Sequence, residues 1–260
     1  TLSSLSGIDY AQSRIQSSYG ESAYTIVCLK LLNIHDLGSY LLTAQQTPLR
    51  HLVIGMSSTH SSDDIELALR QKYRRHVDEV AHWMPTEWQK PLQWIRYLAD
   101  LPALQYLVAG GEPLDWMKSD PDISAFTDDD PQARLQALQQ AGNRRLLESW
   151  RHSGSILTGW LSQWNSMRPK SVTFDKGLQS LEKLLHQQMQ YQLKYELALP
   201  TDYEAILDHL RLIFRRYAFQ PAAVCAYLAI IAIDLHRIRS DLMQRLYFQN
   251  EPDLAQGLPE

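Results

Sequence analysis

The chain has 260 residues, of which 45% are hydrophobic, so it is long enough for one large folded domain or for two to three small lobes. Its 25 basic and 29 acidic residues give a formal net charge of −4, which excludes the overall basic surface of a protein that binds nucleic acid through charge. The first residues lack the basic stretch and apolar run of a signal peptide, so we expect a cytoplasmic protein.

The first half of the chain carries helical patterns. Helices are expected over residues 8–19, 23–32, 37–44, 61–84 and 87–98, with shorter ones between residues 101 and 117. Asp36 is interpreted as the cap of the third, and serine and aspartate open the fourth, which Pro85 ends. The segments TIVCL and HLVIGM contain β-branched residues, but no hairpin turns bound them and no alternation of strands with helices follows. The sequence therefore predicts an all-α fold.

Residues 112–130 differ in composition from the rest of the chain. They hold seven acidic residues against the single Lys118, together with two prolines, which is typical of a solvated loop or of a seam between two lobes. Further helices are expected over residues 131–150, 153–166, 177–198, 202–218 and 221–248. We therefore predict a single helical domain over residues 1–260, with a lobe seam at 112–130.

The last of these helices contains the most apolar part of the sequence. Twelve apolar residues run from Ala222 to Ile233, and charged residues follow at once. A helix that crosses a bilayer needs about twenty apolar residues, so this run predicts a buried core helix of a soluble protein. Its apolar residues continue at spacings of three and four beyond the run, and Pro221 suits the first helical turn.

Glu79 and His82 are the strongest candidates for enzymatic chemistry. Their Glu-x-x-His spacing directs both side chains toward one metal ion in ferritin-like bundles. Such a site needs two of these pairs and two further glutamates, and the sequence has no second Glu-x-x-His pair. No glycine-rich phosphate loop, paired Cys-x-x-Cys or nucleophile elbow occurs either. We therefore expect a solvated helix face, no metal, no cofactor and no enzymatic activity; a helical metal-dependent oxidoreductase is the less favoured alternative.

Several residue types leave two interpretations open. The basic residues between Arg70 and His76 form either a solvated helix face, which is the default, or a docking face for an acidic partner. The seven tryptophans suit a helical core as well as an interface. Cys28 and Cys225 both lie in apolar helical surroundings and are interpreted as buried hydrophobes in a reducing compartment, with a bridge between them left open.

Two segments of the chain resemble each other weakly. DLGSYLLTAQQTPLR (residues 36–50) and DLPALQYLVAGGEPLD (residues 100–115) share an Asp-Leu start, a Tyr-Leu pair and a later Pro-Leu pair. Repeated helical lobes would produce such an echo, and so would chance.

Two segments, AYLAIIAIDLHRIR (residues 226–239) and YAQSRIQ (residues 10–16), lie near opposite ends of the chain. The first is similar to the C-terminal helix, and the second to the opening Tyr-Ala-x-x-Arg helix, of the C (also called d) subunit family of V-type and archaeal A-type ATPases. YLLTAQQTPL and DLPALQYL are similar to its short lobe-opening helices. Arg237 stands where the family has asparagine, so the chain is identified as a divergent member.

The resemblance implies a fold and a function. Members of this family are all-helical, with three similar lobes around a funnel, and have no catalytic centre. They link the central stalk of the rotary ATPase to the membrane proteolipid ring, and so serve ion transport, including proton transport, as peripheral parts of a membrane complex. The resemblance places partner binding at Tyr10, Arg14, Asp234, Arg237 and Arg239.

Two alternatives remain beside this expectation. The charged residues at the end of the C-terminal helix could form local pairs instead of a partner site, Asp234 with Arg14 or Arg237 with Asp241. The whole protein could also be a helical adaptor unrelated to rotary ATPases.

Overall fold

The computed structural model describes residues 2–21, 31, 33–47, 49–141, 143–170, 175–194 and 203–250. Over these residues the chain forms thirteen α-helices, two short 3-10 helices and no strand, so the all-α prediction is confirmed. In chain order the elements are α1 (Leu2–Glu21), α3 (Leu37–Ala44), α4 (Arg50–Val53), α5 (Ser62–Trp83), α6 (Thr86–Gln93), η1 (Trp94–Ala99), α7 (Leu101–Val108), α8 (Asp115–Ser119), η2 (Ser124–Phe126), α9 (Pro131–Gln140), α10 (Arg144–Ser153), α11 (Ile156–Met167), α12 (Asp175–Lys194), α13 (Tyr203–Arg216) and α14 (Pro221–Asn250).

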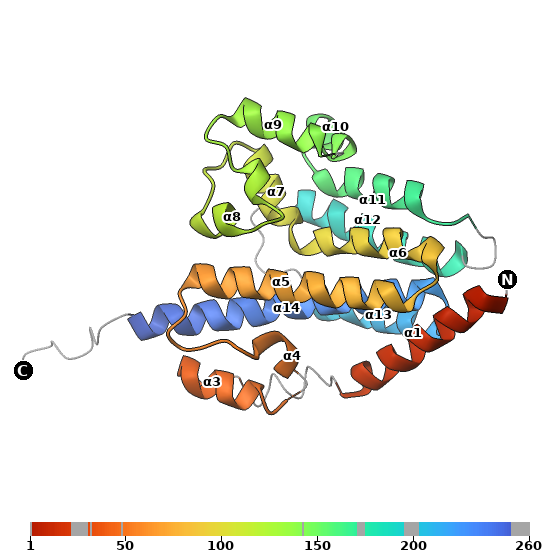
Figure 1. Ribbon diagram of the computed structural model, residues 1–260, viewed down its shortest axis with the longest axis horizontal. Helices are drawn as coiled ribbons and strands as arrows, with labels where there is room; N and C mark the ends of the chain where they lie inside the picture. Colours follow the sequence, from red (N-terminus) through yellow and green to blue (C-terminus); the bar gives the residue numbers. More distant parts are fainter. Residues whose placement is uncertain are drawn as a thin grey trace, which may run out of the picture.

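The helices surround a central antiparallel pair formed by α5 and α14. Figure 1 shows these two side by side across the middle of the molecule, with α1, α3 and α4 below them and α7 to α11 above. The hydroxyl of Tyr73 in the middle of α5 donates to the carbonyl of Leu228, 3.3 Å away, while Glu66 near the start of α5 bonds Arg239, later in α14. The two helices therefore run antiparallel to each other.

The central helix α14 is buried along most of its length. By length and composition it could cross a membrane, but 83% of its most apolar 18-residue window is buried inside the protein. Every residue from Ala222 to Ala232 is buried, which matches the core helix predicted from the twelve-residue apolar run. The helix starts at Pro221, as expected from the place of proline in a first turn.

Local signals set the ends of α5 as predicted. The Ser61 hydroxyl accepts a hydrogen bond from the backbone N–H of Asp64, and the Asp64 carboxylate accepts one from the backbone N–H of Ser61, which together form a capping box. The Ser61 hydroxyl also donates to the Asp64 carboxylate at 2.7 Å, and this bond, together with the one from the Ser61 backbone N–H, lowers the pKa of Asp64. At the other end, the helix stops at Trp83, two residues before Pro85.

Some predicted helices are interrupted. The helix expected over 87–98 is an α-helix that tightens into the 3-10 helix η1 after Gln93, and the helix expected over 131–150 is divided into α9 and α10. The segment HLVIGM forms most of α4 and is not a strand. The helix expected over 23–32, the segment TIVCL and Cys28 lie outside the described residues, with only Leu31 of that helix described.

Tryptophans hold the upper helices onto the centre. The indole N–H of Trp94 donates to the carbonyl of Trp160 at 3.2 Å, and the indole N–H of Trp160 donates to the carbonyl of Trp94 at 3.3 Å. Trp160 also stacks on Trp164, with ring centroids 6.1 Å apart. In the same helix Gly159 faces the backbone of Arg145 so closely that a Cβ would lie 2.3 Å from its carbonyl oxygen. Only glycine allows α10 and α11 to approach this closely.

Candidate partner-binding site

Tyr10 and Arg14 form an exposed group on α1. Tyr10 is 52% exposed, and its hydroxyl lies 2.7 Å from a guanidinium nitrogen of Arg14, one helical turn away. The Arg14 guanidinium also lies over the ring of Trp83, 4.6 Å from the ring centroid, at the end of α5. This arrangement presents a cation and an aromatic ring together on the surface.

Asp234 is buried between α13 and α14. It is only 4% exposed, and its Oδ1 has no hydrogen-bond partner among the described residues. Burial raises the pKa of Asp234 to about 7, while the charges of Arg237 and Arg211 act in the opposite direction. In this structure Asp234 is therefore not presented to a partner, and the charges that act on it are those of Arg237, Arg211 and Glu204.

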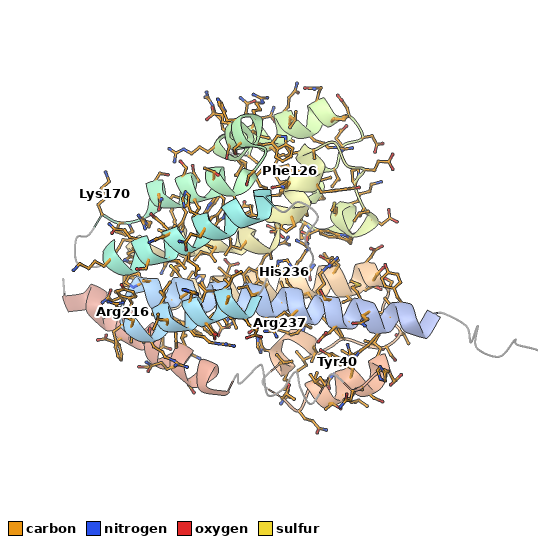
Figure 2. The ribbon with its side chains drawn as sticks, turned by 180° about the vertical axis from the view of Figure 1, so that it is seen from behind. Tyr40, Phe126, Lys170, Arg216, His236 and Arg237 are labelled. Carbon is orange, nitrogen blue, oxygen red and sulfur yellow. The ribbon has the colours of Figure 1, made fainter. Side chains whose placement is uncertain are left out.

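Arg237 points toward α13. Its guanidinium forms an ion pair with Glu204 at 2.9 Å. Figure 2 shows Arg237 on the side of α14 that faces α13, with His236 on the side toward the upper helices. Burial and the charges of Arg70 and Arg239 lower the pKa of His236 to about 4. Asp241, considered above as a partner of Arg237, accepts a hydrogen bond from Tyr40 at 3.2 Å.

Arg239 connects α14 to a buried ion-pair network on α5. Its guanidinium bonds the carboxylate of Glu66, which also accepts a bond of 2.7 Å from Arg70. From Arg70 the network continues through Asp100 at 3.0 Å and Arg74 at 2.7 Å, and Arg74 reaches Asp120 at 2.7 Å. Arg239 itself remains partly exposed at the edge of this network.

This network corrects the expectation for two residues of the basic run, Arg70 and Arg74, whereas Arg75 of the same run is exposed. Arg70 and Arg74 are buried, so they form neither a solvated face nor a docking face for an acidic partner. Arg70 in addition stacks on Trp116, with 4.2 Å between the guanidinium carbon and the ring centroid. Within the acidic segment 112–130, Asp120 is fully buried. The reason is the same in both cases, because each charge is compensated by a partner far away in the sequence.

The five predicted residues do not form one surface. Arg14 contacts Trp83 at the end of α5, and Arg239 bonds Glu66 near its start. These two positions are 17 residues apart on one helix, which corresponds to about 25 Å at 1.5 Å per residue. Tyr10 and Arg14 thus lie at one end of the central pair, and Arg239 lies toward the other.

Glu79 and His82 are both exposed on α5. The Nδ1 atom of His82 lies 2.6 Å from the backbone carbonyl of Asp78, which leaves only Nε2 for a ligand. Among the described residues, no group of three or more histidine, cysteine, aspartate or glutamate side chains could hold a metal ion. Cys225 is a free, buried cysteine, and burial raises the pKa of its thiol to about 12.

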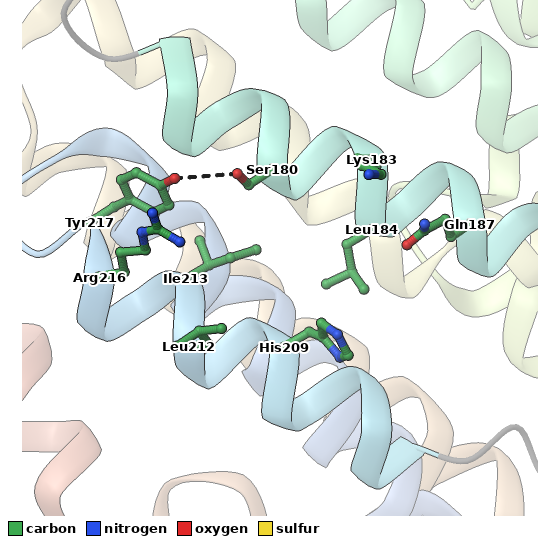
Figure 3. Close-up of a pocket in the computed structure, with 9 residues that line it drawn as sticks. All are labelled: Ser180, Lys183, Leu184, Gln187, His209, Leu212, Ile213, Arg216 and Tyr217. Carbon is green, nitrogen blue, oxygen red and sulfur yellow. Dashed lines mark hydrogen bonds between the residues drawn. The ribbon is translucent and has the colours of Figure 1, made fainter.

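A groove between α12 and α13 was not found from the sequence. It has a volume of about 310 Å³, and the residues that line it are Ser180, Lys183, Leu184, Gln187, His209, Leu212, Ile213, Arg216 and Tyr217. Figure 3 shows leucine and isoleucine side chains in its middle and basic side chains toward both ends. Spacings of three and four along both helices were the available signal, but which faces would meet depends on how the helices pack.

No known family model matches the chain, and no curated protein and no solved structure matches it either. The resemblance to the C (d) family of rotary ATPase subunits therefore rests on the quoted segments alone.

Proposed function

We propose that this chain is a non-catalytic rotor coupling subunit of a V/A-type rotary ATPase. In this role it would link the central stalk to the membrane proteolipid ring from the cytoplasmic side and support ion transport without touching the ion. The proposal includes the arrangement expected of the family, in which three similar helical lobes surround a funnel.

One observation carries the proposal. The two family-like segments come from opposite ends of the chain, and they form α1 and α14, which pack against each other. A chance similarity of two short segments does not require them to lie in neighbouring helices. The all-helical fold is consistent with the same family, and three of the five residues named by the resemblance (Tyr10, Arg14 and Arg239) retain exposed side chains.

Capture of the stalk by the purified full-length chain tests the proposal. The immobilised chain should retain the isolated central-stalk subunits of a V/A-type ATPase from the same cell, and Arg14→Glu should weaken this capture most at low salt, because exposed charges are screened as salt rises. Arg144→Glu is the control, since Arg144 is equally charged and exposed but lies on α10. Failure of the wild-type chain to capture either the stalk subunits or the proteolipid ring would reject the proposal.

A helical adaptor outside the rotary ATPases is the second candidate. The groove between α12 and α13 favours it, because a hollow with an apolar middle and basic ends suits a protein partner whatever complex the chain belongs to. Binding at this groove together with no binding to the stalk would select the adaptor.

A further inference from the structure

We propose that the groove between α12 and α13 binds an acidic amphipathic helix of a partner protein. The proposal does not depend on the rotary ATPase, because it concerns a different surface and the isolated chain can test it. It rests on the apolar floor of the groove, the positions of its basic side chains and the spacing between them.

The floor of the groove exposes apolar surface. Leu212 of α13 is 58% exposed, and Leu184 and Ile213 line the groove beside it. Lining residues extend over about two turns of each helix, from Ser180 to Gln187 and from His209 to Tyr217. An apolar hollow of this length between two helices suits the apolar face of a third helix.

The charges of the groove have one sign. Among the described residues that line it, none is acidic, whereas Lys183, His209 and Arg216 are basic. Acidic residues adjacent in the sequence are already engaged, since Glu182 forms an ion pair with Arg168 at 2.8 Å and Asp208 forms one with Arg211 at 2.9 Å. The basic side chains of this groove therefore have no acidic counterpart among its described lining residues, and an acidic partner would complement them.

The spacing of the basic residues favours a helix over a lipid. His209 and Arg216 are seven residues apart, so they lie on the same face of α13 with about 10 Å between them along the axis. Leu212 and Ile213 lie between them, three and four residues after His209. A helix with carboxylates at positions i and i+7 and leucines at i+3 and i+4 matches both ends and the middle. A phospholipid with a single anionic head group, such as phosphatidylglycerol, matches only one end.

Each end of the groove offers groups that bind carboxylates. At one end Arg216 lies beside Tyr217, whose hydroxyl is 3.4 Å from that of Ser180. At the other end Lys183 and Gln187 face His209 across the groove (Figure 3). The Nδ1 atom of His209 lies 2.7 Å from the carbonyl of Ala205, so Nε2 is the ring nitrogen left for the ligand. Arginine supplies a planar donor pair for one carboxylate, and lysine supplies a point charge for the other.

A labelled peptide tests the inference. The probe is a fluorescein-labelled 15-residue peptide of alanine and glutamine, with glutamates at i and i+7 and leucines at i+3 and i+4, and fluorescence anisotropy reports its binding to the full-length chain. Arg216→Glu should weaken binding by about tenfold or more, because like charges at a contact are strongly unfavourable. Arg215→Glu is the matched control, since Arg215 is exposed and adjacent but does not line the groove, and it should change binding by less than about twofold.

Two further arms make the result decisive. A peptide of the same composition with its second glutamate moved to i+5 should bind at least about tenfold more weakly, since that carboxylate then leaves the shared face. Thermal melts of each variant establish that it is folded. The inference is overturned if the intended peptide does not bind, if both peptides bind with equal affinity, or if Arg216→Glu and Arg215→Glu reduce the affinity for the peptide by the same factor. Binding of phosphatidylglycerol vesicles that depends on Arg216, without peptide binding, would also overturn it in favour of a membrane.

Discussion

Helices α3 and α7 are each preceded by an aspartate and begin with a leucine, but the two aspartates act differently. Both helices are eight residues long, and the two aspartates are Asp36 and Asp100. Asp36 has an extended backbone and is exposed, and its carboxylate accepts a hydrogen bond of 2.6 Å from the backbone N–H of Ser39. It is therefore an ordinary helix cap, as the sequence predicted.

Asp100 makes no such cap. Its backbone is helical because the chain arrives from the 3-10 helix η1, and its side chain turns to Arg70 and Arg74 on α5. Burial raises the pKa of Asp100, and the hydrogen bonds and charges of the two arginines oppose this rise. An aspartate before a helix can cap that helix or pair with arginines of another helix. The backbone conformation that it takes from the preceding element, and the charges of the helix packed against it, decide between the two.

Removal of Asp100 should have the largest effect on stability. Asp100→Ala leaves Arg70 and Arg74 buried with one carboxylate fewer, and loss of one partner of a buried ion pair costs about 3–5 kcal/mol. Urea denaturation at pH 7 measures the free energy of unfolding. Asp122→Asn is the control, because Asp122 also pairs with Arg74 but is partly exposed and should cost much less. Equal losses for the two variants would show that burial does not distinguish the two carboxylates.

Asp234 gives a buried carboxyl group that lacks the hydrogen bonds of Asp100. Its pKa of about 7 in the folded protein exceeds that of an unfolded aspartate, about 3.9, so the folded state holds the proton more tightly. Stability from this group is present at low pH and is lost as the pH rises from about 4 to about 7. Asp234→Asn has no carboxyl group at this position, so its stability should not fall in this way. The free energy of unfolding of the variant minus that of the wild type should therefore increase by about 3 kcal/mol between pH 5 and pH 8.

Comparison of the two proteins at each pH is essential for that prediction. The pKa values of His76 and His236 are lowered to about 4 in the folded protein, so their contributions increase as the pH rises from about 4 to 6.5, opposite to Asp234. Both proteins contain these histidines, and their contributions cancel in the difference. A difference that is constant from pH 5 to pH 8 would contradict the raised pKa of Asp234.

Loss of the Asp36 cap should have a moderate effect. Asp36→Ala leaves the first N–H groups of α3 without this acceptor, which typically costs about 1 kcal/mol. Asp36→Asn keeps an oxygen acceptor at the same place and should remain close to the wild type in thermal and urea unfolding. If the free energy of unfolding falls as much in the asparagine variant as in the alanine variant, the charge of Asp36 contributes more than its hydrogen bond.

The smallest effect is expected for an exposed ion pair. Arg144 and Glu148 are one turn apart on α10 and bond at 2.7 Å, yet both side chains are largely in solvent. Arg144→Ala should therefore change the free energy of unfolding by no more than about 0.5 kcal/mol in urea titrations. A loss as large as that of Asp100→Ala would mean that distance alone, without burial, sets the strength of an ion pair in this protein.

Much of the fold was predictable because its signals are local. Apolar residues at spacings of three and four predicted α5 and α14, and serine and aspartate at the start of α5 predicted its capping box. The twelve-residue run in α14 was correctly interpreted as part of a core helix, because 83% of the most apolar 18-residue window of this helix is buried inside the protein. Each of these inferences depends on residues within a few turns of one another.

The candidate site depends on contacts between residues far apart in the sequence, which no local sequence pattern predicts. Arg70 and Asp100 are 30 residues apart, Arg74 and Asp120 are 46 apart, and Glu66 and Arg239 are 173 apart. A basic run looks the same in sequence whether such partners reach it or not, so the burial of Arg70 and Arg74 could not be predicted. The separation of Arg14 from Arg239 and the groove between α12 and α13 were likewise decided by packing, since helix periodicity names an apolar face but not the helix that it meets.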